Sequence, residues 1–167
     1  HRPPACRGVA LRTESMSPLR LIAAALIAAS FLLAPAAAFA QASLDRVGIM
    51  IWPEYDKPSA LVIVEAEIAP ELLPTQVRFA LPNGVVPHAV AKRGEAGGLF
   101  LAEYTQNSEG DWQVVDVAAD APVVRIEYYA PLSFDGDART FQYVWPGTAA
   151  VGELVYEVKQ PFDASNL

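Results

Sequence analysis

Cysteine and histidine are scarce in this sequence. The only cysteine among the 167 residues is Cys6, and the two histidines are His1 and His88. A usual zinc site needs clustered Cys, His and carboxylate ligands, which these residues do not supply. Nucleophilic catalysis needs a Ser, Cys or Thr beside an activating base, and no such pattern surrounds His88. The sequence therefore predicts no enzyme, no cofactor and no metal site, and no disulfide after Cys6.

Basic residues are also in the minority. The chain has 12 Lys and Arg against 19 Asp and Glu, a net charge of −7. Four of the basic residues and one acidic residue precede Gln41. Residues 41–167 therefore hold 8 basic and 18 acidic residues, a net charge of −10. Nucleic acids and anionic membrane surfaces require a basic footprint, so neither is an expected partner.

Charge is absent altogether from Leu21 to Ala40. Arg20 precedes this run, residues 21–33 are its compact apolar part, and Ala38-Phe39-Ala40 closes it. A positive flank, an apolar stretch and a small-x-small site are the parts of a secretory signal. We predict a signal peptide over residues 16–40 and export to the periplasm or the exterior, where the protein is either free or held at the cell envelope. The alternative is an uncleaved anchor, because the whole run just reaches across a bilayer.

The sequence divides into four parts on this interpretation. Residues 1–15 resemble neither signal nor domain and are interpreted as upstream or mis-started sequence. The signal at 16–40 is followed by a β-domain over 41–160. Residues 161–167 form either a loose tail or the start of a missing C-terminal region, which would leave room for a membrane anchor in a longer native chain.

Long helical patterns are missing from residues 41–160. Short runs rich in Val, Ile, Tyr, Phe and Trp alternate instead with Pro, Gly, Asn and Asp. They predict nine strands, over 46–52, 60–68, 75–81, 85–92, 99–105, 112–118, 123–130, 139–145 and 153–159. This layout favours an all-β, immunoglobulin-like β-sandwich of eight or nine mainly antiparallel strands over a barrel. We expect 139–145 to pair with both 123–130 and 153–159, and Pro87 to mark an edge strand.

Aromatic residues are the best signal for a binding surface. Phe141, Tyr143 and Trp145 alternate with polar or smaller residues, which favours a core stripe over a surface that stacks on sugar rings. Trp52-Pro53-Glu54-Tyr55 reads as a loop, either a binding loop or an apolar plug. The candidate binding residues are Trp52, Tyr55, Tyr129 and Trp145.

Acidic residues offer two weaker candidates. Asp135-Gly136-Asp137 has the oxygen ligands of a calcium loop but also the usual composition of a hairpin turn, which we favour. Glu127 lies beside two tyrosines and is a candidate for one of the two carboxylates of a glycoside hydrolase. Arg125 on the same strand face is, however, a simple ion-pair partner for it.

Together these features indicate a non-catalytic extracytoplasmic module that binds or supports a cell-envelope component, either a glycan or a protein. Two alternatives stay open. One is a small secreted hydrolase that uses two carboxylates, and the other is the exported N-terminal part of a larger membrane-anchored envelope protein.

The signal peptide can be tested directly. We expect the exported protein to begin at Gln41, because Ala38 and Ala40 fit the recognition pattern of signal peptidase. Mass spectrometry of protein from the periplasm or culture medium measures this N-terminus. Recovery of a membrane-bound form that keeps Leu21 to Ala40 would contradict cleavage and favour the anchor.

Overall fold

The computed structural model describes residues 43–94, 96–161 and 164, so the predicted upstream sequence and signal peptide lie outside the described residues. This part of the chain is built from strands, with one short 3-10 helix, η1 (Pro70–Leu72). The strands are β1 (Leu44–Pro53), β2 (Ser59–Glu67), β3 (Thr75–Pro82), β4 (Ala89–Arg93), β5 (Leu99–Leu101), β6 (Tyr104–Glu109), β7 (Trp112–Ala119), β8 (Val123–Pro131), β9 (Ser133–Asp135), β10 (Ala138–Thr140) and β11 (Val151–Val158).

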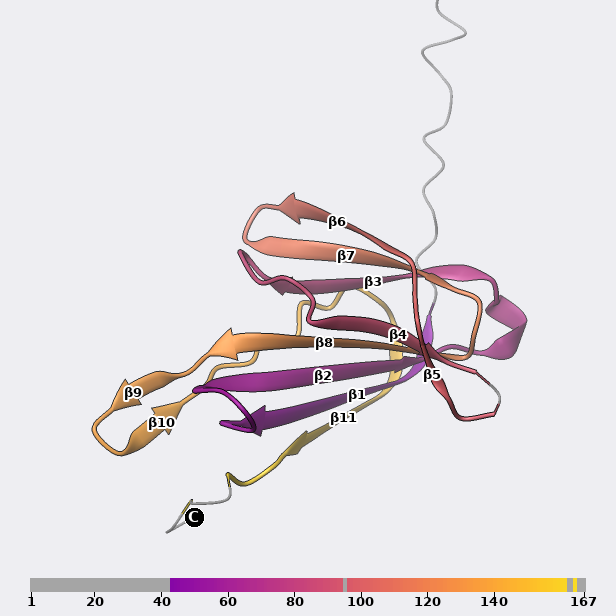
Figure 1. Ribbon diagram of the computed structural model, residues 1–167. Coiled ribbons are helices and arrows are strands. Elements are labelled where there is room, and N and C mark those ends of the chain that lie inside the picture. Colours follow the sequence, from indigo (N-terminus) through magenta and orange to yellow (C-terminus); the bar gives the residue numbers. More distant parts are fainter. Residues whose placement is uncertain (1–42, 95, 162–163, 165–167) are drawn as a thin grey trace, which may run out of the picture. The chain divides into compact units, whose positions relative to one another are not determined.

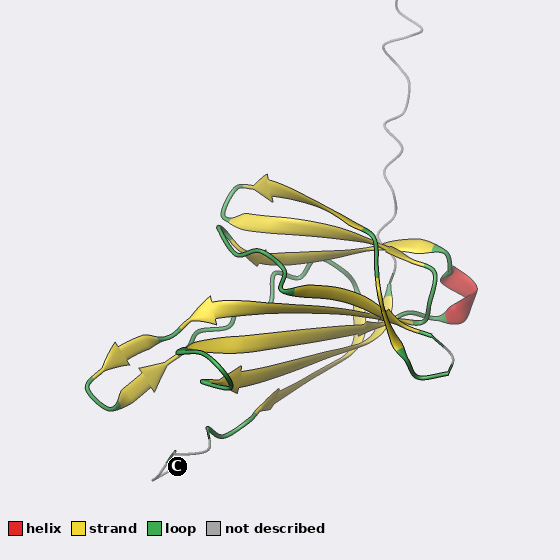
Figure 2. Cartoon of the chain, in the orientation of Figure 1, coloured by secondary structure: helices red, strands yellow, loops and turns green. Residues whose placement is uncertain are grey.

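Two sheets of unequal width make up the β-sandwich-like fold (Figure 1). The large sheet has six strands in the order β11-β1-β2-β8-β4-β5, and the small sheet has three in the order β3-β7-β6. A separate hairpin, β9–β10, extends beyond β8 (Figure 2). The pairings are antiparallel except for β1 with β11, so the prediction of mainly antiparallel strands is confirmed.

Alternation along the strands positions the core between the two sheets. In β8, Val124, Ile126 and Tyr128 are buried, while Arg125 and Glu127 lie on the opposite face. The same period of two places Val77 and Phe79 of the small sheet on the inner side. Residues of both sheets therefore form one apolar cluster, which is the expected arrangement when each sheet has one core face.

Residues 141–150, which we call the strap, correct the predicted eighth strand. Only Ala138–Thr140 forms a strand there, and it pairs with β9 rather than with 123–130 or 153–159. The strap then runs on without ladder pairing, with Phe141, Tyr143 and Trp145 packed against the core. Any extended segment with one side on a core shows a period of two, so the alternation indicated burial correctly but not pairing.

The last strand also differs from its expected partner. β11 lies parallel to β1, with Ile49 opposite Tyr156, because the strap brings the chain back to the end of the sheet at which β1 begins. Parallel neighbours require such a crossover, and here it is an extended segment instead of a helix. The C-terminal end of the strap is fixed by the hydroxyl of Thr148, which donates to the Arg78 carbonyl at 3.1 Å, and by the Leu44 amide, which donates to the Ala150 carbonyl at 2.9 Å.

The predicted edge strand at 85–92 is wrong in position. β4 begins at Ala89 and lies between β8 and β5, so Pro87 precedes the strand and marks no edge. The amide of His88 donates to the Glu127 carbonyl at 2.7 Å, which starts the ladder just after this proline. A proline lacks an amide hydrogen, so it fits before an inner strand as well as in an outer one.

The strap predicts a measurable contrast between adjacent residues. Burial of the Tyr143 ring raises its pKa to about 12, whereas Val144 is exposed. We expect Tyr143→Ala to lower the free energy of unfolding by about 3 kcal/mol because it removes a packed ring. Val144→Ala should change it by no more than about 0.5 kcal/mol. Denaturant unfolding of the two variants measures both values, and equal midpoints would contradict the packing role of the strap.

Candidate functional site

Sheet register brings two aromatic side chains and one lysine into a row on the outer face of the large sheet. Trp52 of β1 is opposite Leu61 of β2, and Leu61 is opposite Tyr129 of β8. The Lys159 amide donates to the Ile51 carbonyl at 2.9 Å, which extends the β11 ladder and places Lys159 beside Trp52. Because Ile51 and Tyr128 face the core, their neighbours Trp52 and Tyr129 face outward.

The β1–β2 loop folds so that its own side chains join this row. Glu54 takes a left-handed conformation with φ of 49°, and its amide donates to the Ser59 carbonyl at 2.9 Å. The Arg139 side chain, from the β9–β10 hairpin, forms an ion pair with Glu54 at 3.2 Å. These contacts hold the loop at the turn between β1 and β2. We call Trp52, Tyr55, Asp56, Lys57, Tyr129 and Lys159 the loop-end cluster.

One half of the loop-end cluster surrounds Trp52. The ring centroids of Trp52 and Tyr55 are 5.0 Å apart, with the planes tilted by 53°. The Lys159 ammonium lies 4.5 Å from the Trp52 ring centroid and 5.5 Å from that of Tyr55. This cation–π geometry holds the lysine over both rings, while 57% of the Tyr55 surface remains exposed.

The other half of the loop-end cluster surrounds Tyr129. Its hydroxyl donates to Asp56 Oδ2 at 2.9 Å, and the Lys57 ammonium lies 3.8 Å from the ring centroid. The His88 ring meets the same tyrosine edge-on at 5.1 Å. The hydrogen bond to Asp56 is the main reason that the pKa of Tyr129 lies above its usual value of 10.0. The carboxylate stabilises the neutral phenol and disfavours a second negative charge beside it.

These contacts change what the aromatic residues can offer a ligand. The lysines occupy the faces of the Trp52 and Tyr129 rings, so those faces are not an open stacking surface. Leu61, which lies between them on the outer face, is only 5% exposed because the neighbouring side chains cover it. What the cluster presents to solvent is the Tyr55 ring, with the positively charged ends of two lysines near the aromatic row.

Trp145 does not join the loop-end cluster, although the sequence also indicated it as a binding residue. It lies on the strap, and with Tyr143 it lines a small cavity between the sheets, against Phe79 and Ile126. Three of the four predicted residues therefore gather at one place, and the fourth is partly buried against the core.

The acidic candidates are engaged by structural contacts. Asp135-Gly136-Asp137 spans the turn of the β9–β10 hairpin, with Gly136 at a φ of 56°. Glu127 pairs with Arg125 at 2.8 Å, as its position on the strand face suggested. Glu65 lies between Arg93 and Arg125 and pairs with both.

Sequence reasoning missed Asp56, Lys57 and Lys159. The first two lie beside Tyr55 in the printed sequence, so the loop could have been read as a mixed aromatic and charged segment. Lys159 had no such signal, because it meets Trp52 only through the parallel pairing of β11 with β1.

Comparison of the chain with protein-family models and with curated protein sequences finds no match. Over residues 43–94, 96–161 and 164, no three His, Cys, Asp or Glu side chains converge as metal ligands would. No helix among the described residues is long and apolar enough to cross a membrane.

The contact between Tyr129 and Asp56 can be tested by titration. We expect Asp56→Ala to lower the pKa of Tyr129, because the acceptor and its charge are both lost. Asp56→Asn should lower it less, since an amide oxygen can still accept the hydrogen bond. In the parent protein, the stabilisation from this raised pKa is complete below pH 10 and is lost as the pH rises through the folded value. Ultraviolet titration of tyrosine ionisation, with Tyr129→Phe to assign the step, measures the pKa. An unchanged step in Asp56→Ala would contradict the assignment.

Proposed function

We propose that this protein is an exported, non-catalytic module that binds or supports a component of the cell envelope, either a glycan or a protein. The signal-like N-terminal sequence supports export. The packing of two sheets of short, mainly antiparallel strands supports a sandwich of the immunoglobulin-like type. Modules with this architecture commonly bind through loops at the ends of the strands.

The observation that carries the proposal is the loop-end cluster. Tyrosine and tryptophan are enriched where proteins meet other molecules, because each combines apolar area with a polar edge. Tyr55 is such a residue on an exposed loop, and its ring packs on Trp52 rather than lying free in solvent. Since that contact already restricts the ring, binding through Tyr55 loses less conformational entropy than binding through a mobile side chain.

The lysines define the polar part of the proposed surface. Six of the eight basic residues after Gln41 form ion pairs with carboxylates, as Arg46 does with Glu67 and Glu153. Within the described residues, Lys57 and Lys159 instead contact aromatic rings of the loop-end cluster. Their ammonium groups keep donors available for hydroxyl and carbonyl oxygens of a glycan or a protein.

The proposal predicts that binding is lost when the cluster is trimmed. We expect Tyr55→Ala and Lys57→Gln each to weaken retention on purified peptidoglycan or envelope proteins by about tenfold, equivalent to about 1.4 kcal/mol. Tyr55 is largely exposed and packs mainly on Trp52, so its removal should lower the free energy of unfolding by no more than about 1.5 kcal/mol.

Tyr104→Ala is the matched control, because Tyr104 is an exposed tyrosine on β6 of the small sheet. Co-sedimentation with the insoluble glycan and surface binding to purified envelope proteins measure retention. Equal retention by all three variants and the parent protein would overturn the loop-end cluster as the binding surface.

A further inference from the structure

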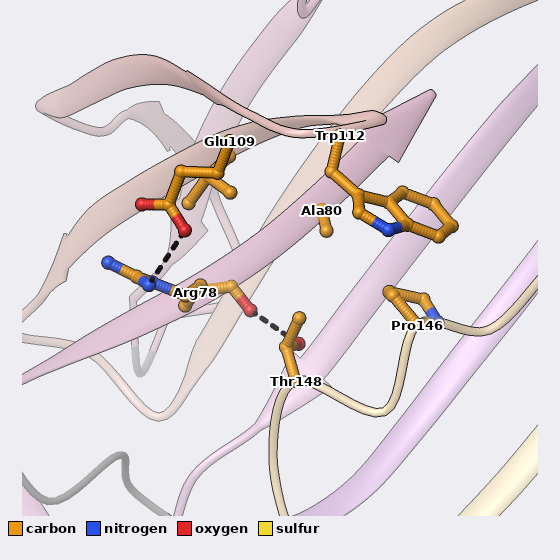
Figure 3. A pocket seen from close by; sticks show the side chains of 7 residues that line it. Arg78, Ala80, Glu109, Trp112, Pro146 and Thr148 are labelled. Atoms are coloured by element: carbon orange, nitrogen blue, oxygen red, sulfur yellow. Dashed lines mark hydrogen bonds and ion pairs between the residues drawn. The ribbon is translucent and has the colours of Figure 1, made fainter. Parts of the chain in front are cut away.

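A groove lies on the other sheet, on the outer face of β3 and β7 beside the strap (Figure 3). Its volume is about 250 Å³. The Trp112 indole forms one wall and faces Pro146 of the strap, and Ala80 also lines the groove (Figure 3). Val114 lies in the same lining and is 4% exposed. This side of the groove is thus apolar and bounded by an aromatic plane.

The opposite side of the groove is polar and held in place. Arg78 binds Asp116 through two hydrogen bonds, Nε to Oδ1 at 2.8 Å and Nη2 to Oδ2 at 3.0 Å. Its Nη1 lies 3.6 Å from Glu109 Oε2. Two-point contact with a carboxylate fixes the plane of a guanidinium group. The Glu109 side chain keeps 54% of its surface exposed, so its oxygens can accept further hydrogen bonds.

The strap fixes the third side of the groove. Thr148 donates its hydroxyl to the carbonyl of Arg78 at the free edge of β3. This bond sets the position of the strap against the sheet, and with it the position of Pro146 (Figure 3). The groove is therefore formed before any ligand arrives, which lowers the entropy lost on binding.

We propose that this groove binds a single pyranose ring of a glycan. A pyranose has an apolar face of C–H groups and a rim of hydroxyls, which matches an indole wall opposite an exposed carboxylate and a fixed guanidinium. The volume lies below the about 300–1,000 Å³ typical of drug-sized ligands and cofactors, and it suits one ring. The C–H face packs on Trp112, and the hydroxyls donate to Glu109 and accept from Arg78.

This inference does not rest on the loop-end cluster, because the two sites lie on different sheets and share no residue. The three tryptophans report on different places: Trp52 belongs to the loop-end cluster, Trp112 to the groove, and Trp145 packs against the core. Each indole N–H gives its own signal in a nitrogen–proton correlation spectrum, assigned by replacing each tryptophan with phenylalanine.

The test is titration of the protein with methyl β-D-glucopyranoside, methyl α-D-mannopyranoside and N-acetylglucosamine. We expect at least one sugar to shift the Trp112 signal saturably, with a dissociation constant on the order of 1–10 mM, while the Trp52 and Trp145 signals stay in place. Glu109→Gln should weaken this binding severalfold, and Tyr55→Ala should leave it unchanged. Trp112→Ala should abolish the saturable shifts of backbone signals around the groove.

Several results would overturn the inference. They are an unmoved Trp112 signal with all three sugars, a shift confined to Trp52, or full binding by both Trp112→Ala and Glu109→Gln. If Trp112→Ala fails to fold, Glu109→Gln decides alone, because its side chain is largely exposed. A shift confined to Trp52 would leave the proposed function standing, and loss of envelope retention in Tyr55→Ala would do so independently of the groove.

Discussion

The two sheets share one core but differ in width, and this mismatch constrains the rest of the structure. Three strands cannot cover six, so the sandwich needs other segments to close its sides. The strap closes one side with Phe141, Tyr143 and Trp145. Beyond the strap the core face of the large sheet continues uncovered onto β11, where Leu154, Tyr156 and Val158 are exposed although their partners Val47, Ile49 and Ile51 are buried.

In the described part of the chain, no second layer of strands covers the outer face of the large sheet. Ile63 on this face is nevertheless only 1% exposed. Long side chains lie on the same face: Arg125 forms ion pairs with both Glu65 and Glu127, and the apolar stem of an arginine held in this way can cover apolar groups of the sheet. The loop-end cluster does the same for Leu61 at the end of the sheet. The residues proposed to bind a partner thus also complete the packing of the strand ends.

Strands with a core face on one side were predictable from the sequence. The ranges 75–81 and 123–130 correspond closely to β3 and β8, since Pro, Gly and Asp bracket an alternating apolar pattern in each. The predicted strand 99–105 instead serves both sheets. Ala102 donates to Val90 of the large sheet, while Glu103 accepts from Ala118 of the small one, so the chain changes sheets between adjacent residues.

The candidate site was predictable only where its residues are close in sequence. Trp52 and Tyr55 are separated by two residues, and a loop signal between them was visible. The contribution of Lys159 depends on which strand lies beside β1, and that pairing is set by the path of the strap. The groove is similar, because Trp112 and Pro146 meet only after the strap crosses the edge of β3. The alternation of apolar residues along the sequence indicates which side chains are buried. The contacts of Lys159 with Trp52 and of Trp112 with Pro146 depend instead on chain topology.

The parallel pairing of β1 with β11 has a mechanical consequence. The chain enters β1 at Leu44 and leaves β11 at Val158, and these residues lie at opposite ends of the shared ladder. Tension applied between the two ends of the domain therefore pulls the strands past each other along their length. The hydrogen bonds of the ladder carry that load together in shear, whereas an antiparallel terminal pair pulled from one end would open bond by bond. The domain is thus arranged to resist stretching along the chain.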